Sequence, residues 1–217
     1  MQQMKYLISI LMLLLPYTLR ANGDDAVKLL DKAVAQIKAD GGVQMDFEYK
    51  VCDANGVSLF SEKGFLYIDN NTETKQNERF ALHLEQLKIW CNGVVQWNYS
   101  AHTNEIYITD ADSDEAQNLS PLHIMQLYKQ GYNCLMKEKA AEVVVTLTPE
   151  DANVEFNEVT VHLAKNSLQP TRMVLDMGEN GTTEIIIKSY KGGCRFNDNQ
   201  FECPLKQFAD AEVVDMR

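Results

Sequence analysis

The chain has 217 residues, of which 45% are hydrophobic and 24% are charged, and its formal net charge is −11 at pH 7. This length is enough for one domain with a substantial core. The acidic balance argues against binding to nucleic acid or docking on anionic lipid head groups, and it favours partners that present a basic face.

The first 23 residues are typical of a secretory signal peptide. Lys5 precedes a mostly apolar run, Tyr6–Leu15, and residues 21–23 (Ala-Asn-Gly) form a small-x-small cleavage site. The run is too short to span a bilayer, which needs about 20 apolar residues; a retained membrane anchor is the alternative. No cysteine directly follows the predicted cleavage site, so we expect a soluble, exported chain without a lipid anchor, with residues 24–217 as a single domain.

The exported part begins with an amphipathic pattern. One apolar stripe over Asp24–Asp40 predicts a helix that Gly41 ends, and a single narrow stripe is typical of a helix lying across a sheet. Apolar and polar residues then alternate from Val43 to Asp53, which predicts a strand with one wet face. Further strands are expected at Val57–Glu62, Gly64–Asp69, Arg79–Leu84 and Leu87–Cys91.

Two hairpins and a short helix are expected next. Asn92-Gly93 is a strong hairpin signal, typical of a type I′ turn, and the strand after it returns as Glu105–Thr109. Ser120 followed by Pro121 predicts the start of a helix, which Gly131 is placed to end.

The second half of the chain continues as strands. They are expected at Val143–Thr148, Val154–Leu163, Thr171–Met177 and Thr182–Tyr190. About eleven strands at this spacing indicate an antiparallel meander in a mainly β (α+β) fold. So many consecutive hairpins curl into a barrel or a strongly bent sheet, and the two helices would bury their stripes against its concave face.

Apolar and aromatic residues line one face of several predicted strands and of the second helix. This pattern is typical of a packed core, and it also suits an adaptable pocket for a flexible apolar ligand. The candidate ligand-binding residues are Met45, Phe47, Tyr49, Phe65, Tyr67, Trp97, Tyr99, Ile106, Ile108, Leu122, Met125, Tyr128, Met173 and Leu175.

Residue spacings typical of enzymes or metal sites are missing. The four histidines fall on separate elements, without a nucleophile motif, a zinc-protease motif or a phosphate-binding glycine loop. The acidic run Asp110–Glu115 lacks the twelve-residue pattern of a calcium loop. We therefore expect no catalysis, no cofactor and no metal.

The five cysteines leave two interpretations open. Cys194 and Cys203 flank a turn-like segment, Asn197–Asn199, so a disulfide between them is possible in an exported chain. The other interpretation is that all five are small buried hydrophobes.

Three stretches together resemble the LolA family of bacterial periplasmic lipoprotein carriers. They are NGVVQWNYSAHTNEIYI, SPLHIMQLYKQGYN and DAEVVDMR. The resemblance implies an unclosed antiparallel barrel with a helical lid over a hydrophobic cavity, a periplasmic location and a monomer. It also implies acylated lipoproteins as cargo, an inner-membrane lipoprotein-releasing transporter and an outer-membrane acceptor. The family usually has a basic residue and a proline after the glycine that opens the third strand, and its arginine helps latch the lid; Gly64–Asp69 has neither.

The sequence thus favours a carrier that shields acyl chains from water between the inner and outer membranes. Each buried methylene contributes about 0.8 kcal/mol, so a concave apolar sheet with a movable cover stabilises such cargo without covalent chemistry. A sensory or regulatory lipid- or protein-binding domain on the same fold is the main alternative, because fold alone does not fix function. A lipid-metabolising enzyme is disfavoured by the missing catalytic spacings.

Overall fold

The structure is a computed structural model that describes residues 23–70, 78–117, 126–129, 131–151 and 156–217. These residues form one twelve-stranded sheet in the order β12-β6-β5-β4-β3-β2-β1-β11-β10-β9-β8-β7. The strands are β1 Gly42–Cys52, β2 Ser58–Asp69, β3 Arg79–His83, β4 Leu87–Asn92, β5 Val95–Ser100, β6 Glu105–Asp110, β7 Tyr132–Glu138, β8 Glu142–Pro149, β9 Glu158–Ala164, β10 Pro170–Asp176, β11 Thr182–Cys194 and β12 Glu212–Asp215. The helical elements are α2 Gly23–Ala39, α3 Asp114–Gln117 and the 3-10 turns η1 Leu127–Lys129, η2 Gly178–Asn180, η3 Asp198–Phe201 and η4 Leu205–Phe208.

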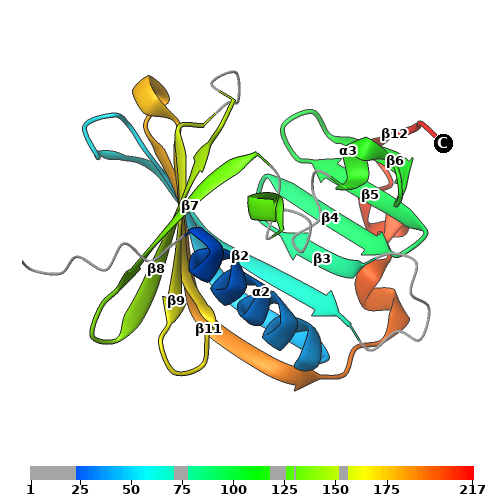
Figure 1. Cartoon of the computed structure of the whole chain (residues 1–217). Coiled ribbons are helices and arrows are strands. Elements are labelled where there is room, and N and C mark those ends of the chain that lie inside the picture. The colour runs from blue at the N-terminus through cyan, green and yellow to red at the C-terminus, as the bar shows by residue number, and fades with distance from the viewer. Residues whose placement is uncertain (1–22, 71–77, 118–125, 130, 152–155) are drawn as a thin grey trace, which may run out of the picture.

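The sheet is strongly bent around α2. Figure 1 shows β7–β9 on one side of the helix and β3–β6 on the other. All strand pairs are antiparallel except β12 with β6, and β12 and β7 form the two edges. Within the described residues no pairing joins these edges, so the barrel stays unclosed. The predicted fold class is confirmed, with twelve described strands in place of about eleven.

The first strand, β1, is central because it pairs with β2 on one side and with β11 on the other. Asp53 closes the β1–β2 hairpin: its Oδ1 accepts hydrogen bonds from the backbone N–H of Asn55 at 2.9 Å and of Val57 at 2.8 Å. The sequence predicted a break near Lys63, but β2 continues through Gly64. A Cβ at Gly64 would lie 2.1 Å from Cζ of Phe47 on the neighbouring strand β1. The ring of Phe47 therefore occupies the space that a side chain at position 64 would need.

Helix α2 connects the two halves of the sheet. Its C-terminal Ile37, 1% exposed, packs with Val43, Met45 and Ile68, whereas Leu30 packs with residues of β8 and β9. Full burial of a leucine or isoleucine side chain contributes about 1.5–3 kcal/mol, so this stripe holds the helix on the inner face. Gly41, with φ of 69°, follows the end of the helix, as predicted.

Several local predictions need correction. β7 and β12 were not predicted, because β7 follows directly after the expected second helix and β12 has only four, mostly exposed residues. The hairpin after β4 is present, but Asn92 does not adopt a positive φ; instead its Oδ1 accepts hydrogen bonds from the backbone N–H of Val94 and Val95. The expected helix from Ser120 falls mainly outside the described residues.

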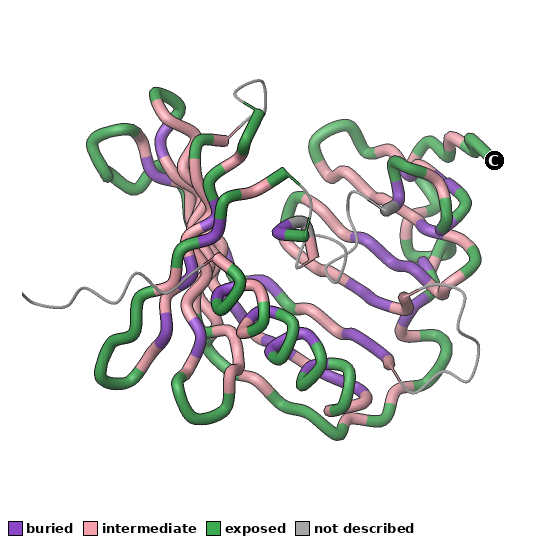
Figure 2. Tube along the Cα trace, viewed as in Figure 1, coloured by how far each residue is buried: buried purple, intermediate pink, exposed green. Residues whose placement is uncertain are grey.

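The segment after β11 covers the outer face of the sheet. Residues 195–211 contain η3 and η4 and lie outside β3–β6, on the side away from α2 (Figure 1). Phe201 and Cys203 pack there with Ala81, Trp90 and Ile106. Buried residues therefore occur on both sides of β3–β6, since Phe80 and Ile89 pack in the inner cluster and Ala81 and Trp90 in the outer one. Figure 2 shows how many residues of these strands are buried.

Candidate functional site

The inner face of the sheet, which α2 partly covers, is apolar over β1 and β8–β11. The strand register aligns these residues: Phe47 is opposite Ile187, Tyr49 is opposite Ile185, and Ile185 is opposite Met173 on the next strand. The inner residues on these strands are Met45, Phe47, Tyr49, Val143, Val145, Leu147, Val159, Val161, Leu163, Met173, Leu175, Ile185 and Ile187.

Some residues of this inner face are buried, and others are partly exposed to solvent. Met45 and Phe47 are buried, with 3% and 5% of their surface exposed. A neighbouring group of inner residues is only half-buried, and we call it the apolar floor: Tyr49, Val159, Val161, Met173, Leu175 and Ile185. The sequence predicted Tyr49, Met173 and Leu175 from this group. It missed the valines and Ile185, although the alternation within their predicted strands was the signal that could have found them.

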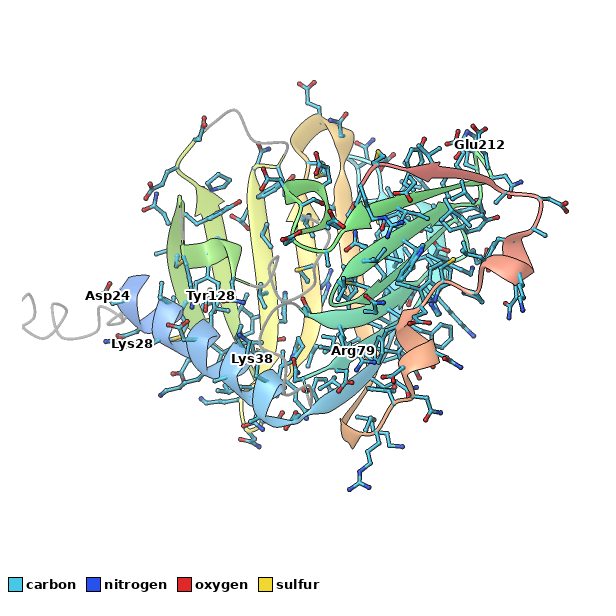
Figure 3. All side chains as sticks on the ribbon, turned by 90° about the vertical axis from the view of Figure 1, so that its right-hand side faces the viewer. Asp24, Lys28, Lys38, Arg79, Tyr128 and Glu212 are labelled. Carbon is cyan, nitrogen blue, oxygen red and sulfur yellow. The ribbon has the colours of Figure 1, made fainter. Side chains whose placement is uncertain are left out.

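Tyr128 lies on the same side of the sheet as α2. Its hydroxyl donates a 2.7 Å hydrogen bond to Oδ1 of Asp31, and Nζ of Lys129 lies 3.0 Å from the same oxygen (Figure 3 shows Tyr128 near the start of the helix). The Tyr128 hydrogen bond and then Lys129 lower the pKa of Asp31, whereas burial and Asp31 raise the pKa of Tyr128. This contact fastens the end of the predicted lid segment to α2. Leu122 and Met125, also predicted for the lid, lie outside the described residues.

The remaining predicted residues lie on the opposite, outer face, which corrects the expectation of one shared cavity. They are Phe65, Tyr67, Trp97, Tyr99, Ile106 and Ile108. On β2 the register places Leu66 opposite Met45, so Phe65 and Tyr67 point the other way. On β5 and β6 the apolar residues contact the C-terminal segment. An apolar strand face indicates burial, but it does not say which side of the sheet provides the cover.

Arg79 on β3 fastens this C-terminal segment. Its Nη2 lies 2.7 Å from Oδ1 of Asp198 and its Nη1 lies 3.5 Å from Oδ2 of Asp69. The guanidinium also lies over the ring of Phe201, 4.8 Å from the centroid, a favourable cation–π geometry. Figure 3 shows Arg79 beside the C-terminal segment. The arginine therefore holds the outer cover on the sheet.

Cys194 and Cys203 are not bonded to each other in this structure. Burial raises the pKa of Cys91 and of Cys203 to about 11, so both stay protonated at neutral pH. Cys52, Cys91, Cys134 and Cys203 are buried. Four of the five cysteines thus match the interpretation as small buried hydrophobes.

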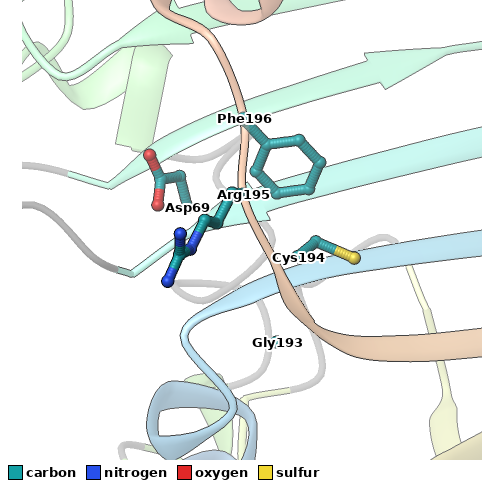
Figure 4. Close-up of a pocket in the computed structure, with 5 residues that line it drawn as sticks. All are labelled: Asp69, Gly193, Cys194, Arg195 and Phe196. Atoms are coloured by element: carbon teal, nitrogen blue, oxygen red, sulfur yellow. The ribbon is translucent and has the colours of Figure 1, made fainter.

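A separate hollow of about 440 Å³ lies where β11 continues into the C-terminal segment. Figure 4 shows its lining residues, Asp69, Gly193, Cys194, Arg195 and Phe196. None of them is a predicted ligand-binding residue, and Cys194 was predicted only as a possible disulfide partner. With an acidic and a basic side chain in its lining, this hollow is not a continuation of the apolar floor.

Two described histidines lie close to other side chains on the outer face. His162 Nδ1 lies 2.9 Å from Oε2 of Glu142, a pair of partly exposed side chains. Burial and then Lys88 lower the pKa of His83, which packs against Tyr67 and Trp90 on the outer face. Among the described residues, no three His, Cys, Asp or Glu side chains come together as metal ligands.

Within the described residues, no helix is both long and apolar enough to cross a membrane.

Comparisons with known proteins agree with this fold. The crystal structure of MucB superposes with a TM-score of 0.54 at 16% identity, covering 88% of this chain and 66% of that one. The complex of MucA and MucB from Pseudomonas aeruginosa gives 0.47 at 13% identity, covering 88% and 63%. A LolA superfamily protein from Nitrosomonas europaea gives 0.42 at 12% identity, covering 83% and 98%. No curated protein matches the sequence.

A family model gives more specific evidence than the MucB structure, which at 16% identity shows the fold alone. The model is described as outer membrane lipoprotein carrier protein LolA, and it matches residues 16–179. The match includes α2 and β1–β10, and therefore most of the apolar floor. Because it covers more than half of the chain, this protein belongs to the LolA family of outer membrane lipoprotein carriers.

Proposed function

We propose that this protein is a periplasmic carrier that binds the acyl chains of lipoproteins on its apolar floor and moves them from the inner to the outer membrane. The observation that supports this proposal is that the apolar floor, on β1 and β9–β11, is only half-buried. Each methylene removed from water contributes about 0.8 kcal/mol, so this surface favours binding of a long hydrocarbon chain. Family membership points to the same class of ligand.

The proposed transport needs two partners but no chemistry. An inner-membrane lipoprotein-releasing transporter would load the carrier, and an outer-membrane acceptor would receive the cargo. The net charge of −11 favours partners with basic contact surfaces. No bond is made or broken, so the proposal includes neither catalysis nor a cofactor. The carrier would act as a monomer, and residues 1–23, which lie almost wholly outside the described part, would serve as its export signal.

Variants of two neighbouring residues on β10 test the apolar floor. Met173 faces inward and Val174 faces outward, and both are half-buried. Met173→Glu should weaken binding of an apolar fluorophore at least about tenfold, roughly 1.4 kcal/mol, because ligand binding would bury an unpaired carboxylate. Val174→Glu is the matched control and should bind normally. Equal affinities in two folded variants would refute the role of the floor.

The cargo itself can be identified from the native protein. Mass spectrometry of organic extracts from protein purified from the periplasm should detect acylated lipoprotein. An extract without any acylated species, from protein that still binds the fluorophore, would contradict the carrier proposal.

A regulatory binding domain remains the second candidate, and the similarity to MucB favours it. That structure has the highest TM-score of those described here, and a related structure contains MucB with MucA as its partner. The present chain covers 66% of MucB. A carrier must release its ligand, so a labelled lipopeptide should pass from the loaded protein to acceptor membranes. Stable retention of the lipopeptide, together with capture of one protein partner, would favour the regulator.

A further inference from the structure

The inner face of β5 and β6 is polar, in contrast to the apolar floor. The register places Gln96 opposite Thr109, Asn98 opposite Tyr107, and Ser100 opposite Glu105. Through Cys91, Phe80 and Ile68 this row continues to Val43 on β1, so it shares the inner face with the floor. The apolar residues of β5 and β6 point to the outer face instead.

Two of these polar side chains are deeply buried. Gln96 is 1% exposed and Thr109 is 4% exposed. Nε2 of Gln96 donates a 3.1 Å hydrogen bond to Oδ1 of Asn98. The hydroxyl oxygen of Thr109 is excluded from solvent and has no hydrogen-bond partner. A buried hydroxyl without a partner is unfavourable, and valine would fill the same space without that penalty.

We infer that Gln96, Asn98 and Thr109 form a polar subsite that binds the ester or amide carbonyl of an acylated ligand. This inference rests on the proposed function, because the acyl chains of the same ligand would lie on the apolar floor. The hydroxyl of Thr109 and the amide of Asn98 supply donors for a carbonyl oxygen. The ligand would therefore bind with its linkage group at β5–β6 and its chains extending toward β1 and β9–β11.

The dimensions of the sheet agree with this orientation. β5 lies four strands from β1, about 19 Å along the sheet at the usual strand spacing. An extended fatty acyl chain has a comparable length. A ligand anchored at its carbonyl would thus have a defined position on the sheet, whereas hydrocarbon alone has no directional contacts.

Thr109→Val tests the subsite because it removes the hydroxyl while keeping the shape. Binding of an ester-linked diacylglycerol and of a synthetic triacylated lipopeptide should weaken about 3- to 10-fold. Binding of the ether-linked dialkylglycerol, which lacks the carbonyls, should not change. The matched control is Thr160→Val on the outer face of β9, where the hydroxyl contacts Glu158 and all three ligands should bind as to the wild type.

The set of ligands whose binding weakens in the variants also identifies which carbonyl the subsite binds. Weaker binding of both carbonyl ligands assigns the subsite to the acyl esters that they share, and a loss confined to the lipopeptide assigns it to the amide-linked end. Asn98→Ala, at a half-buried position, is the second variant and should show the same selectivity if Thr109→Val does not fold.

Two results separate failure of this inference from failure of the proposed function. If the wild-type protein binds the ligands but neither variant weakens binding of the diacylglycerol or the lipopeptide relative to the ether, the subsite is wrong and the carrier function stands. If the wild-type protein binds none of the ligands, both are wrong.

Discussion

Replacing Phe201 by alanine should separate the structural outer face from the proposed ligand face. Phe201 is fully buried; its ring packs edge-on against Phe196 at 5.6 Å and lies under the guanidinium of Arg79. Truncation of a buried phenylalanine typically costs about 3–5 kcal/mol, as lost transfer energy and a residual cavity. For a domain of this size we therefore expect the Tm to fall by about 6–20 °C.

The assay compares stability with ligand affinity in the same variants. Thermal unfolding gives the Tm, and fluorophore titration well below the transition gives the affinity. Leu205→Ala is the matched control, because Leu205 belongs to the same segment but is 43% exposed, so its change should stay within about 0.5 kcal/mol. Phe201→Ala should lose stability and keep the wild-type affinity.

Two results would refute this reasoning. A Tm for Phe201→Ala equal to that of Leu205→Ala would show that the C-terminal segment does not stabilise the sheet. A loss of affinity in folded Phe201→Ala would show that the outer face takes part in binding, as the sequence first predicted for Trp97 and Tyr99.

Two further predictions concern the inner face. The carboxyl of Asp31 has a lowered pKa in the folded state, so its stabilising effect is present above the unfolded value of 3.8 and is lost as the pH falls below it. The stability difference between wild type and Asp31→Asn, measured by urea unfolding, should thus shrink from about pH 6 to about pH 3; a constant difference would contradict the contact with Tyr128 and Lys129. Gly64→Ala should cost about 1–3 kcal/mol because the ring of Phe47 occupies its side-chain space, and an unchanged urea midpoint would contradict this packing.

Much of the fold was predictable because its signals are local. The alternation in Val43–Asp53 and the apolar stripe of the first helix each correspond to an element of the structure. β12 was not predictable in this way, since four mostly exposed residues are too few to show a period. Its pairing with β6 depends on the path of the preceding residues 195–211, which cover the outer face of β3–β6.

The candidate site was predictable only in part, for a different physical reason. Alternation on β1 and β10 identified Met45, Tyr49 and Met173 correctly as inner residues, since α2 and the bend of the sheet place the apolar side there. On β5 the same alternation selected Trp97, which faces outward. Periodicity gives the two faces of each strand, but only strand pairing over the whole sheet decides which faces are continuous.

The inner face of the sheet therefore changes from apolar on β10 and β11 to polar on β5 and β6. On β10 and β11 the outer face carries ion pairs such as Arg172 with Glu184 beside Val174, whereas Met173, Leu175 and Ile185 point inward. On β5 and β6 the C-terminal segment buries the apolar residues from outside, which leaves the inner positions to polar side chains. On β3 and β4 the inner positions remain apolar, because Phe80, Ile89 and Cys91 pack there in a buried cluster. A bent sheet can in this way present hydrocarbon-binding and hydrogen-bonding surfaces to the same ligand.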